Sequence, residues 1–171
     1  MTMQSPNLPV SFAPDPANER LLRNAFGRFA TGVTIVTAPS SDGPVGIVAN
    51  SFSSVSLDPA LVLWSVAKTS RRFPYFEVAD HYAIHVLGVE QSALCDGVAK
   101  DAYALRDRQL RANADGTPLI EDCLARFECR RMAVHDAGDH AIILGQVQQT
   151  EMRDGDPLTF YAGRFGQVAE I

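Results

Sequence analysis

Three short segments carry the side chains whose types and spacing could do chemistry. Ser51, Ser53 and Ser54 form a cluster of hydroxyls, Lys68-Thr69-Ser70 combines a cation with two hydroxyls, and Gly138-Asp139-His140 places a carboxylate beside an imidazole. Hydroxyls and a cation are suited to a phosphate group and a polyhydroxy chain. The second segment also ends where a helix is predicted to begin, and the unpaired N–H groups of a helix N-terminus attract phosphate.

Strand geometry limits how the three serines can act together. Successive side chains of a strand point to opposite faces, so Ser51 and Ser53 share one face and Ser54 lies on the other. All three reach the same ligand only where the strand bulges. Taken alone, a serine-rich strand edge is more often a solvated surface than a binding site.

Other catalytic and metal-binding patterns are absent from the sequence. It contains no G-x-S-x-G of a hydrolase, no Walker-type phosphate loop and no G-x-G-x-x-G after a strand. His81 and His85 have the spacing of a helical metal pair, but they lie on a predicted strand, where four residues span about 13 Å. No metal site is therefore predicted.

Composition and charge exclude further classes of protein. A net charge of −5 and a pI near 5.3 argue against nucleic acid as a partner, because binding to it depends on clustered Lys and Arg. No apolar run approaches the roughly 20 residues that span a bilayer. Cys95, Cys123 and Cys129 form no C-x-x-C pair, so neither redox chemistry nor a disulfide framework is predicted. A cytoplasmic protein without a membrane segment is expected.

The elements that must position these segments are mostly strands. β-branched and apolar runs predict strands over 31–37, 45–52, 61–66, 82–87, 124–135, 141–152 and 158–162. Apolar residues at helical spacing, with capping residues before them, predict helices over 16–28, 70–80 and 91–100. The polar segment 101–118 has the weakest pattern and is interpreted as loop or weakly helical.

The order of these elements indicates the fold class. Strands come in clusters joined by tight turns, such as 136–139, and a regular alternation of strand and helix is absent. This arrangement favours a mainly β (α+β) antiparallel barrel with a few peripheral helices over a doubly wound sheet. The length fits one domain, which we expect over residues 15–171, preceded by a flexible N-terminal arm over residues 1–14.

Four motifs, in this order, resemble those of the short flavin reductases that serve two-component monooxygenases. They are Phe29–Thr37, Gly46–Ser56 with Leu57-Asp58-Pro59, Gly138-Asp139-His140, and Asp156-Pro157-Leu158 followed by Gly163-Arg164. Each motif is short, but the resemblance extends over nearly the whole chain from about Leu22 onward. It implies the antiparallel Greek-key split β-barrel of that family.

The resemblance also implies a set of ligand-binding residues. It places FMN or FAD against Thr31, Val33, Val48, Ala49, Asn50, Ser51, Ser54, Lys68, Thr69 and Ser70. The small side chain of Ala49 permits close approach of the ring, and backbone N–H groups face the edge that gains charge on reduction. NADH or NADPH as co-substrate is placed beside His140, Tyr161 and Arg164, with Phe160 the alternative to Tyr161 as the aromatic residue of the site.

The activity implied is hydride transfer from NADH or NADPH to the flavin, and no side-chain acid or base is indispensable for it. The resemblance further implies a homodimer whose interface completes each site, and a flavin-dependent monooxygenase component that receives the reduced flavin. Two alternatives stay open: a flavin-binding electron-transfer protein that does not use nicotinamide, and a split-barrel oxidoreductase that acts on another substrate. The sequence does not decide whether the flavin is FMN or FAD, or whether the co-substrate is NADH or NADPH.

Overall fold

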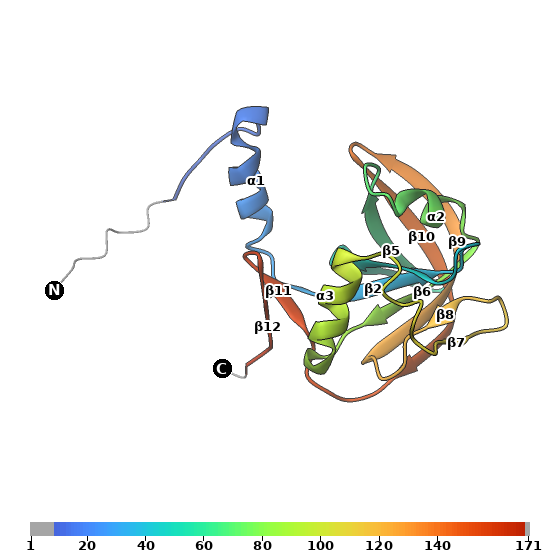
Figure 1. Ribbon diagram of the computed structural model, residues 1–171. Helices are drawn as coiled ribbons and strands as arrows, with labels where there is room; N and C mark the ends of the chain where they lie inside the picture. The colour runs from blue at the N-terminus through green and yellow to red at the C-terminus, as the bar shows by residue number, and fades with distance from the viewer. Residues whose placement is uncertain (1–8, 170–171) are drawn as a thin grey trace.

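The computed structural model describes residues 9–169, and Figure 1 shows a rolled antiparallel sheet with three short helices around it. The helices are α1 (Glu19–Phe26), α2 (Phe73–Val78) and α3 (Ser92–Lys100), with 3₁₀ turns at Pro16–Asn18 and Val89–Gln91. The strands are β1 (Thr31–Gly32), β2 (Thr34–Ala38), β3 (Val45–Ala49), β4 (Ser53–Leu57), β5 (Ala60–Ala67), β6 (His81–Val86), β7 (Arg111–Ala112), β8 (Pro118–Leu119), β9 (Ala125–Ala137), β10 (His140–Met152), β11 (Thr159–Tyr161) and β12 (Arg164–Gly166).

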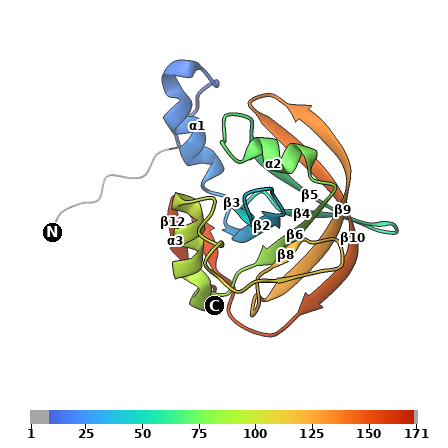
Figure 2. The same ribbon diagram turned by 45° about the vertical axis from the view of Figure 1, so that its right-hand side comes forward.

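Seven of these strands form one antiparallel sheet in the order β3-β2-β6-β9-β10-β5-β4. The sheet curls into a barrel (Figure 2), and its two ends approach each other where the Ser51 hydroxyl bonds both backbone groups of Ser65 on β5. The mainly β, split-barrel prediction is confirmed.

Strand β2 shows how the sequence produces this barrel. All five of its residues are buried, because apolar material covers both of its faces. Val36 joins the cluster inside the barrel around Trp64, whereas Ile35 faces the outer cluster that α3 supplies with Leu94 and Val98. The alternation of side chains along a strand therefore sends neighbouring apolar residues into two different cores.

The long hairpin of β9 and β10 confirms the predicted pair of extended runs. The strands run further than expected, to Ala137 and from His140, so that only Gly138 and Asp139 form the turn. Gly138 has φ +72°, a conformation that glycine adopts without steric cost. This tight turn fixes where His140 begins its strand.

Besides the helix over 70–80, which is shortened to α2, three predicted elements differ from the structure. The strand over 31–37 is broken at Val33, whose N–H donates to Leu158 instead of continuing the ladder. The strand over 45–52 ends at Ala49, and the chain bends before β4 begins at Ser53. The segment 101–118 contains turns and most of a small β7–β8 hairpin, which its polar sequence concealed. The contact that holds this hairpin to the sheet is distant in the chain: the Thr37 hydroxyl donates to the Pro118 carbonyl at 2.6 Å.

The first predicted helix is confirmed as the 3₁₀ turn followed by α1. Asp15 caps it: its side chain accepts the Ala17 N–H at 2.8 Å, while the Asn18 side chain accepts the Asp15 N–H at 2.9 Å. No residue of α1 is buried, and the helix projects away from the barrel in Figure 1. Its apolar side chains, including Leu21 and Phe26, are exposed.

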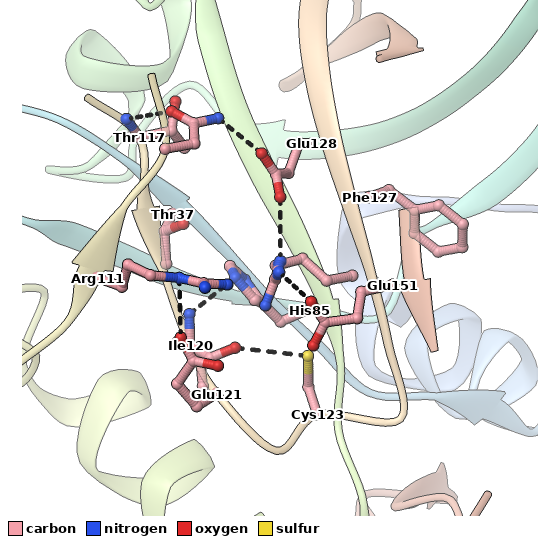
Figure 3. A network of polar contacts seen from close by, with 12 residues as sticks. Thr37, His85, Arg111, Thr117, Ile120, Glu121, Cys123, Phe127, Glu128 and Glu151 are labelled. Atoms are coloured by element: carbon pink, nitrogen blue, oxygen red, sulfur yellow. Dashed lines mark hydrogen bonds and ion pairs between the residues drawn. The ribbon is translucent and has the colours of Figure 1, made fainter. Parts of the chain in front are cut away.

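A buried polar network joins β6, β9 and β10 beneath the β7–β8 pair (Figure 3). Arg126 is only 2% exposed and bonds Glu128 at 3.3 Å and Glu151 at 2.6 Å. Asn113 donates to the other Glu128 oxygen at 2.8 Å and so ties the 113–117 loop to the sheet. The paired carboxylates offset the cost of burying the guanidinium.

Part of the predicted N-terminal arm, residues 1–8, and residues 170–171 of the predicted domain lie outside the described residues. Within residues 9–169, no helix has the length and apolarity needed to cross a bilayer. The same part of the chain holds no group of three or more His, Cys, Asp or Glu side chains placed to share a metal ion.

Candidate functional site

A hollow of about 750 Å³ lies between the α1–β1 segment and the barrel. Its volume is within the range of about 300–1,000 Å³ that is typical of small-molecule sites. Its walls combine aromatic rings with polar side chains that come from distant parts of the sequence. The residues used below are Phe26, Phe29, Thr31, Asn50, His140 and Phe160.

Thr31 contributes an unsatisfied hydroxyl to this hollow. It lies on β1, whose partner strand β11 brings Phe160 directly opposite. The Thr31 Oγ1 atom is buried and has no hydrogen-bond partner among residues 9–169. A buried hydroxyl without a partner is costly, so a ligand polar group in the hollow would stabilise this arrangement.

Asn50 enters the hollow because β3 ends one residue before it. Ala49 is the last strand residue, and its carbonyl accepts the Thr34 hydroxyl at 2.7 Å. Asn50 is exposed at the bend, and its side chain makes no hydrogen bond within the described part of the chain. An amide with free donors and acceptors therefore faces the space beside a small, buried alanine.

His140 reaches the same hollow from the opposite part of the sheet. It is the first residue of β10 and is registered with Ala67 of β5. Its Nδ1 atom lies 2.8 Å from an oxygen of Asp139, and the hydrogen bond from His140 lowers the pKa of that carboxyl. The carboxylate thus orients the imidazole, whose Nε2 atom stays available to a ligand.

The Lys68–Ser70 segment lies next to this part of the hollow, but the Lys68 and Ser70 side chains are hydrogen-bonded within the chain. Lys68 Nζ donates to Asp136 at 2.7 Å and to the Gly138 carbonyl at 2.6 Å, which holds the β9–β10 turn in place. Ser70 is not at a helix N-terminus as predicted, because α2 begins at Phe73. Its hydroxyl instead accepts the Arg72 N–H at 3.2 Å. Thr69 is exposed.

The serines are distributed differently from the predicted strand. Ser51 lies in the bend before β4, where its hydroxyl is bonded to Ser65 at 2.8 and 3.1 Å. Ser53 and Ser54 are exposed on β4, and the register with β5 shifts after Ser54. This irregularity follows all three serines, so it does not bring Ser54 to the face of Ser53. Ser51, however, uses its hydroxyl to hold the two ends of the sheet together.

Four further predicted ligand residues lie at the edge of the site or away from it. Val33 is 1% exposed in the outer core, so it positions Thr31 and cannot contact a ligand directly in this conformation. Val48 is half-buried against the same cluster. Tyr161 and Arg164 face each other on β11 and β12, and both are exposed. Phe160, and not Tyr161, lines the hollow.

The α1–β1 segment supplies residues that the sequence reasoning did not assign. Phe26, Phe29, Arg23 and Arg28 line the hollow, although the segment was interpreted only as a helix and the start of a motif. The sequence contains one signal for this role, the aromatic pair Phe26 and Phe29. In the structure their side chains are 71% and 78% exposed. Such exposed aromatic side chains beside a cavity are typical of a binding surface.

The arrangement as a whole can hold a planar ring with polar edges. Aromatic rings cover the apolar part, Thr31 and Asn50 offer hydrogen-bonding groups, and His140 lies across the hollow from α1. Arg23 and Arg28 add positive charge suited to phosphate groups. The combination fits a flavin with a second ring stacked against it, so the residues present agree with the predicted cofactors.

Comparison with known proteins gives a consistent result. Residues 26–169 match the family model described as flavin reductase like domain. The chain is 52% identical over 158 residues to the FMN reductase (NADH) SmoA of Agrobacterium fabrum, and the alignment covers 92% of this chain and 91% of that protein. It is 43% identical over 148 residues to the reductase component of the flavin-dependent trigonelline monooxygenase of Acinetobacter baylyi. That alignment covers 85% of this chain but only 48% of the relative, so the chain spans about half of that protein.

Solved structures share the fold. The NADH:FAD oxidoreductase SgcE6 of Streptomyces globisporus, in complex with NAD and FAD fragments, superposes with a TM-score of 0.84 at 34% identity. The superposition covers 93% of this chain and 98% of that one.

Proposed function

The chain belongs to the flavin reductase-like family, and from this membership we propose that its hollow beside Asn50 and His140 holds the flavin that it reduces. It is a nicotinamide-dependent flavin reductase that uses FMN or FAD as the hydride acceptor. NADH is the co-substrate supported by the names of its relatives. A single observation carries the assignment of the site: Thr31, Asn50 and His140, distant in the sequence, line one hollow together with Phe160.

A flavin bound in the hollow supplies the N5 atom that accepts a hydride from the nicotinamide C4 atom. The chain's own part is to bind and orient the two rings. Ala49 permits close approach, Thr31 and Asn50 offer hydrogen bonds to the ring edge, and His140 holds the second ring near the first. Holding two reactants at contact distance supplies a large share of the rate enhancement of such a transfer. The aromatic residues of the α1–β1 segment exclude water from the contact.

Anaerobic mixing tests this function. Purified protein is titrated with FMN and with FAD, and each complex is mixed with NADH or NADPH in a stopped-flow instrument. A flavin reductase bleaches the visible flavin band rapidly with at least one dinucleotide. A flavin-binding electron-transfer protein retains the band, and a protein without a flavin site gives no binding in the first step. Either of those results contradicts the proposal.

The reduced flavin goes to a separate oxygenase component. Several relatives are reductase components or subunits of flavin-dependent monooxygenases, which supports a monooxygenase as the acceptor for this chain. Adding the product of a neighbouring oxygenase gene to the reductase, FMN or FAD and NADH is expected to give substrate-dependent oxygen consumption.

Free thiols at Cys95, Cys123 and Cys129 are in keeping with a reducing cytoplasm as the location.

A homodimer is the proposed assembly. The amphipathic helix α1 buries none of its residues against its own barrel, yet it contributes Arg23, Asn24 and Phe26 to the wall of the hollow. A second copy packed on its apolar face would both cover these side chains and close the site. A two-fold dimer is the commonest assembly among soluble homo-oligomers.

A further inference from the structure

The turn between β9 and β10 leads into His140, and a residue that follows a third strand holds this turn. In the sheet β10 lies between β9 and β5, and Lys68 comes directly after the last residue of β5. The Lys68 side chain extends past the start of β10 to Asp136 on β9, where Nζ donates to Oδ2 at 2.7 Å. Lys68 therefore connects the two strands that flank His140.

Three of the four residues 136–139 contact Lys68. Besides the bond to Asp136, its Nζ atom donates to the Gly138 carbonyl at 2.6 Å, and its backbone N–H donates to the Asp139 carbonyl at 2.9 Å. Asp136 adds a contact inside the turn, because its Oδ1 atom accepts the Gly138 N–H at 3.3 Å. The Asp136 carboxylate thus joins the hydrogen bond within the turn to the bridge from Lys68.

Packing gives this turn little support. A Cβ atom at Gly138 would meet nothing within 4 Å beyond its chain neighbours, and the Asp139 side chain is 90% exposed. Hydrogen bonds, those from Lys68 among them, therefore hold the turn, and a core does not. Its position matters for the site because Asp139 lies 2.8 Å from His140 Nδ1 and orients the imidazole that lines the hollow. A shift of the turn would move this carboxylate and the imidazole with it.

The ion pair between Lys68 and Asp136 is poorly placed to stabilise the fold. Its side chains are 33% and 82% exposed, and exposed ion pairs add little to the free energy of unfolding. The pair does fix geometry, since one ammonium group binds both a side chain and a main-chain carbonyl of the same turn.

We propose that Asp136 is a positioning residue for the nicotinamide: through Lys68 it fixes the turn that presents Asp139 and His140 to the hollow. Asp136 does not line the hollow and acts through the imidazole alone. This inference rests on the proposed function, because it takes His140 to be the residue beside the nicotinamide. The predicted contact of Lys68 with the flavin is a different role, and the experiment separates the two.

The test begins with two variants of the bridge. Asp136→Ala removes both acceptor oxygens, and Lys68→Met removes the ammonium but retains the apolar stem. We expect each to lower kcat/KM for NADH about threefold, mainly by raising KM, because an imidazole in a loosely held turn positions the nicotinamide less well. The dissociation constant for flavin should change less than about twofold. The double variant should lose no more than either single variant, since each breaks the same bridge.

The same change in a His140→Ala background distinguishes positioning from a general structural role. When Asp136 acts through His140, adding Asp136→Ala to His140→Ala lowers kcat/KM no further. A structural role elsewhere would lower kcat/KM by the same factor in both backgrounds.

The matched control is Asp80→Ala. Asp80 pairs with Arg131 of β9 at 3.0 Å, the side chains are 83% and 27% exposed, and neither residue lines the hollow. This variant should leave kcat/KM for NADH unchanged. Thermal unfolding of each variant confirms that it is folded.

Three results would overturn the proposal. They are unchanged kinetics of Asp136→Ala, an equal loss with and without His140, and a Lys68→Met variant that weakens flavin binding but leaves KM for NADH as it was. Wild-type protein that reduces neither flavin with either dinucleotide refutes the proposed function itself, and this result is obtained before any variant is compared.

Discussion

At the scale of single residues, the chemistry depends on side chains that the fold leaves partly unsatisfied. Thr31 and Asn50 line the hollow proposed to hold the flavin and have no internal partners, whereas Ser51 and Lys68 use their polar atoms to hold the barrel together. Similar residue types thus have different roles. The difference lies in which neighbours the tertiary structure provides for each group.

The role proposed for His140 is to bind the nicotinamide and not the flavin. Replacing His140 by Ala removes an imidazole that lines the hollow but leaves Thr31 and Asn50 in place. We expect kcat/KM for NADH to fall about tenfold, equivalent to about 1.4 kcal/mol. The dissociation constant for flavin should change little. The control is His135→Ala, an exposed histidine of β9 outside the hollow. Unchanged steady-state kinetics for His140→Ala would contradict the assigned role.

His85 makes the stability of the protein depend on pH. Its Nε2 atom accepts the Ile120 N–H at 3.0 Å, so Nδ1 carries the proton and donates to the Ile35 carbonyl at 3.0 Å. Burial lowers the pKa of His85 to about 3, below the value of about 6.5 in an unfolded chain. The unfolded state therefore binds the extra proton first, and the stabilisation is complete above about pH 6.5 and lost toward about pH 3.

The expected contribution is a fall of up to about 1.4 kcal/mol in the free energy of unfolding for each pH unit within this window. Denaturant unfolding at several pH values measures it. His85→Gln should reduce stability at pH 7 but remove this part of the slope, whereas the exposed His135→Gln should leave the slope as it is. A wild-type slope retained in His85→Gln would show that other groups are responsible.

At the scale of elements, the sheet is fitted closely around its aromatic core. Trp64, Tyr82 and Phe76 pack edge to face inside the barrel, and Gly145 of β10 faces the Tyr82 hydroxyl. A Cβ atom at Gly145 would overlap that hydroxyl and lie 2.9 Å from the ring carbon that bears it. Because both strands belong to the barrel wall, neither can easily move away.

Gly145→Ala is accordingly expected to lower the free energy of unfolding by about 1–3 kcal/mol, as overpacking of a core does. The matched control is Gly32→Ala, where an added Cβ meets nothing within 4 Å. Combining Gly145→Ala with Tyr82→Phe removes the overlapping hydroxyl, which has no partner in the described residues, and should restore part of the loss. Denaturant unfolding of all four proteins measures the effect. Equal stability of Gly145→Ala and Gly32→Ala would refute the explanation.

At the scale of the whole molecule, the projecting helix α1 is the observation that supports the proposed homodimer. Leu21 and Phe26 are 45% and 71% exposed on a helix with no buried residue. Exposed apolar surface on a helix is usually covered by another chain. The proposed homodimer provides that cover and relates assembly to the flavin site.

Leu21→Glu tests this arrangement without altering a residue of the hollow. A carboxylate on the apolar face of α1 should shift the sedimentation coefficient from dimer to monomer and weaken flavin binding in parallel. Arg20→Glu places the same group on the neighbouring exposed position and should leave the dimer intact. A wild-type monomer with full affinity for flavin would contradict the homodimer.

The sequence by itself determined the class of fold, most of the strands and the segments that bear chemistry. These features depend on local patterns: alternation along strands, helix spacing, and turn residues such as Gly138. It also placed Thr31, Asn50 and His140 among the candidates, through motifs that resemble those of flavin reductases.

Only the tertiary structure decided which candidates share a hollow and which serve the barrel. Contacts such as Ser51 with Ser65, or Lys68 with Asp136, join residues that no local pattern relates. The break at Val33 and the bend after Ala49 likewise depend on partners distant in the chain. Hydrogen bonds and packing between remote segments are what assign each polar group to a ligand or to the fold, because each group is satisfied by whichever neighbour the fold places beside it.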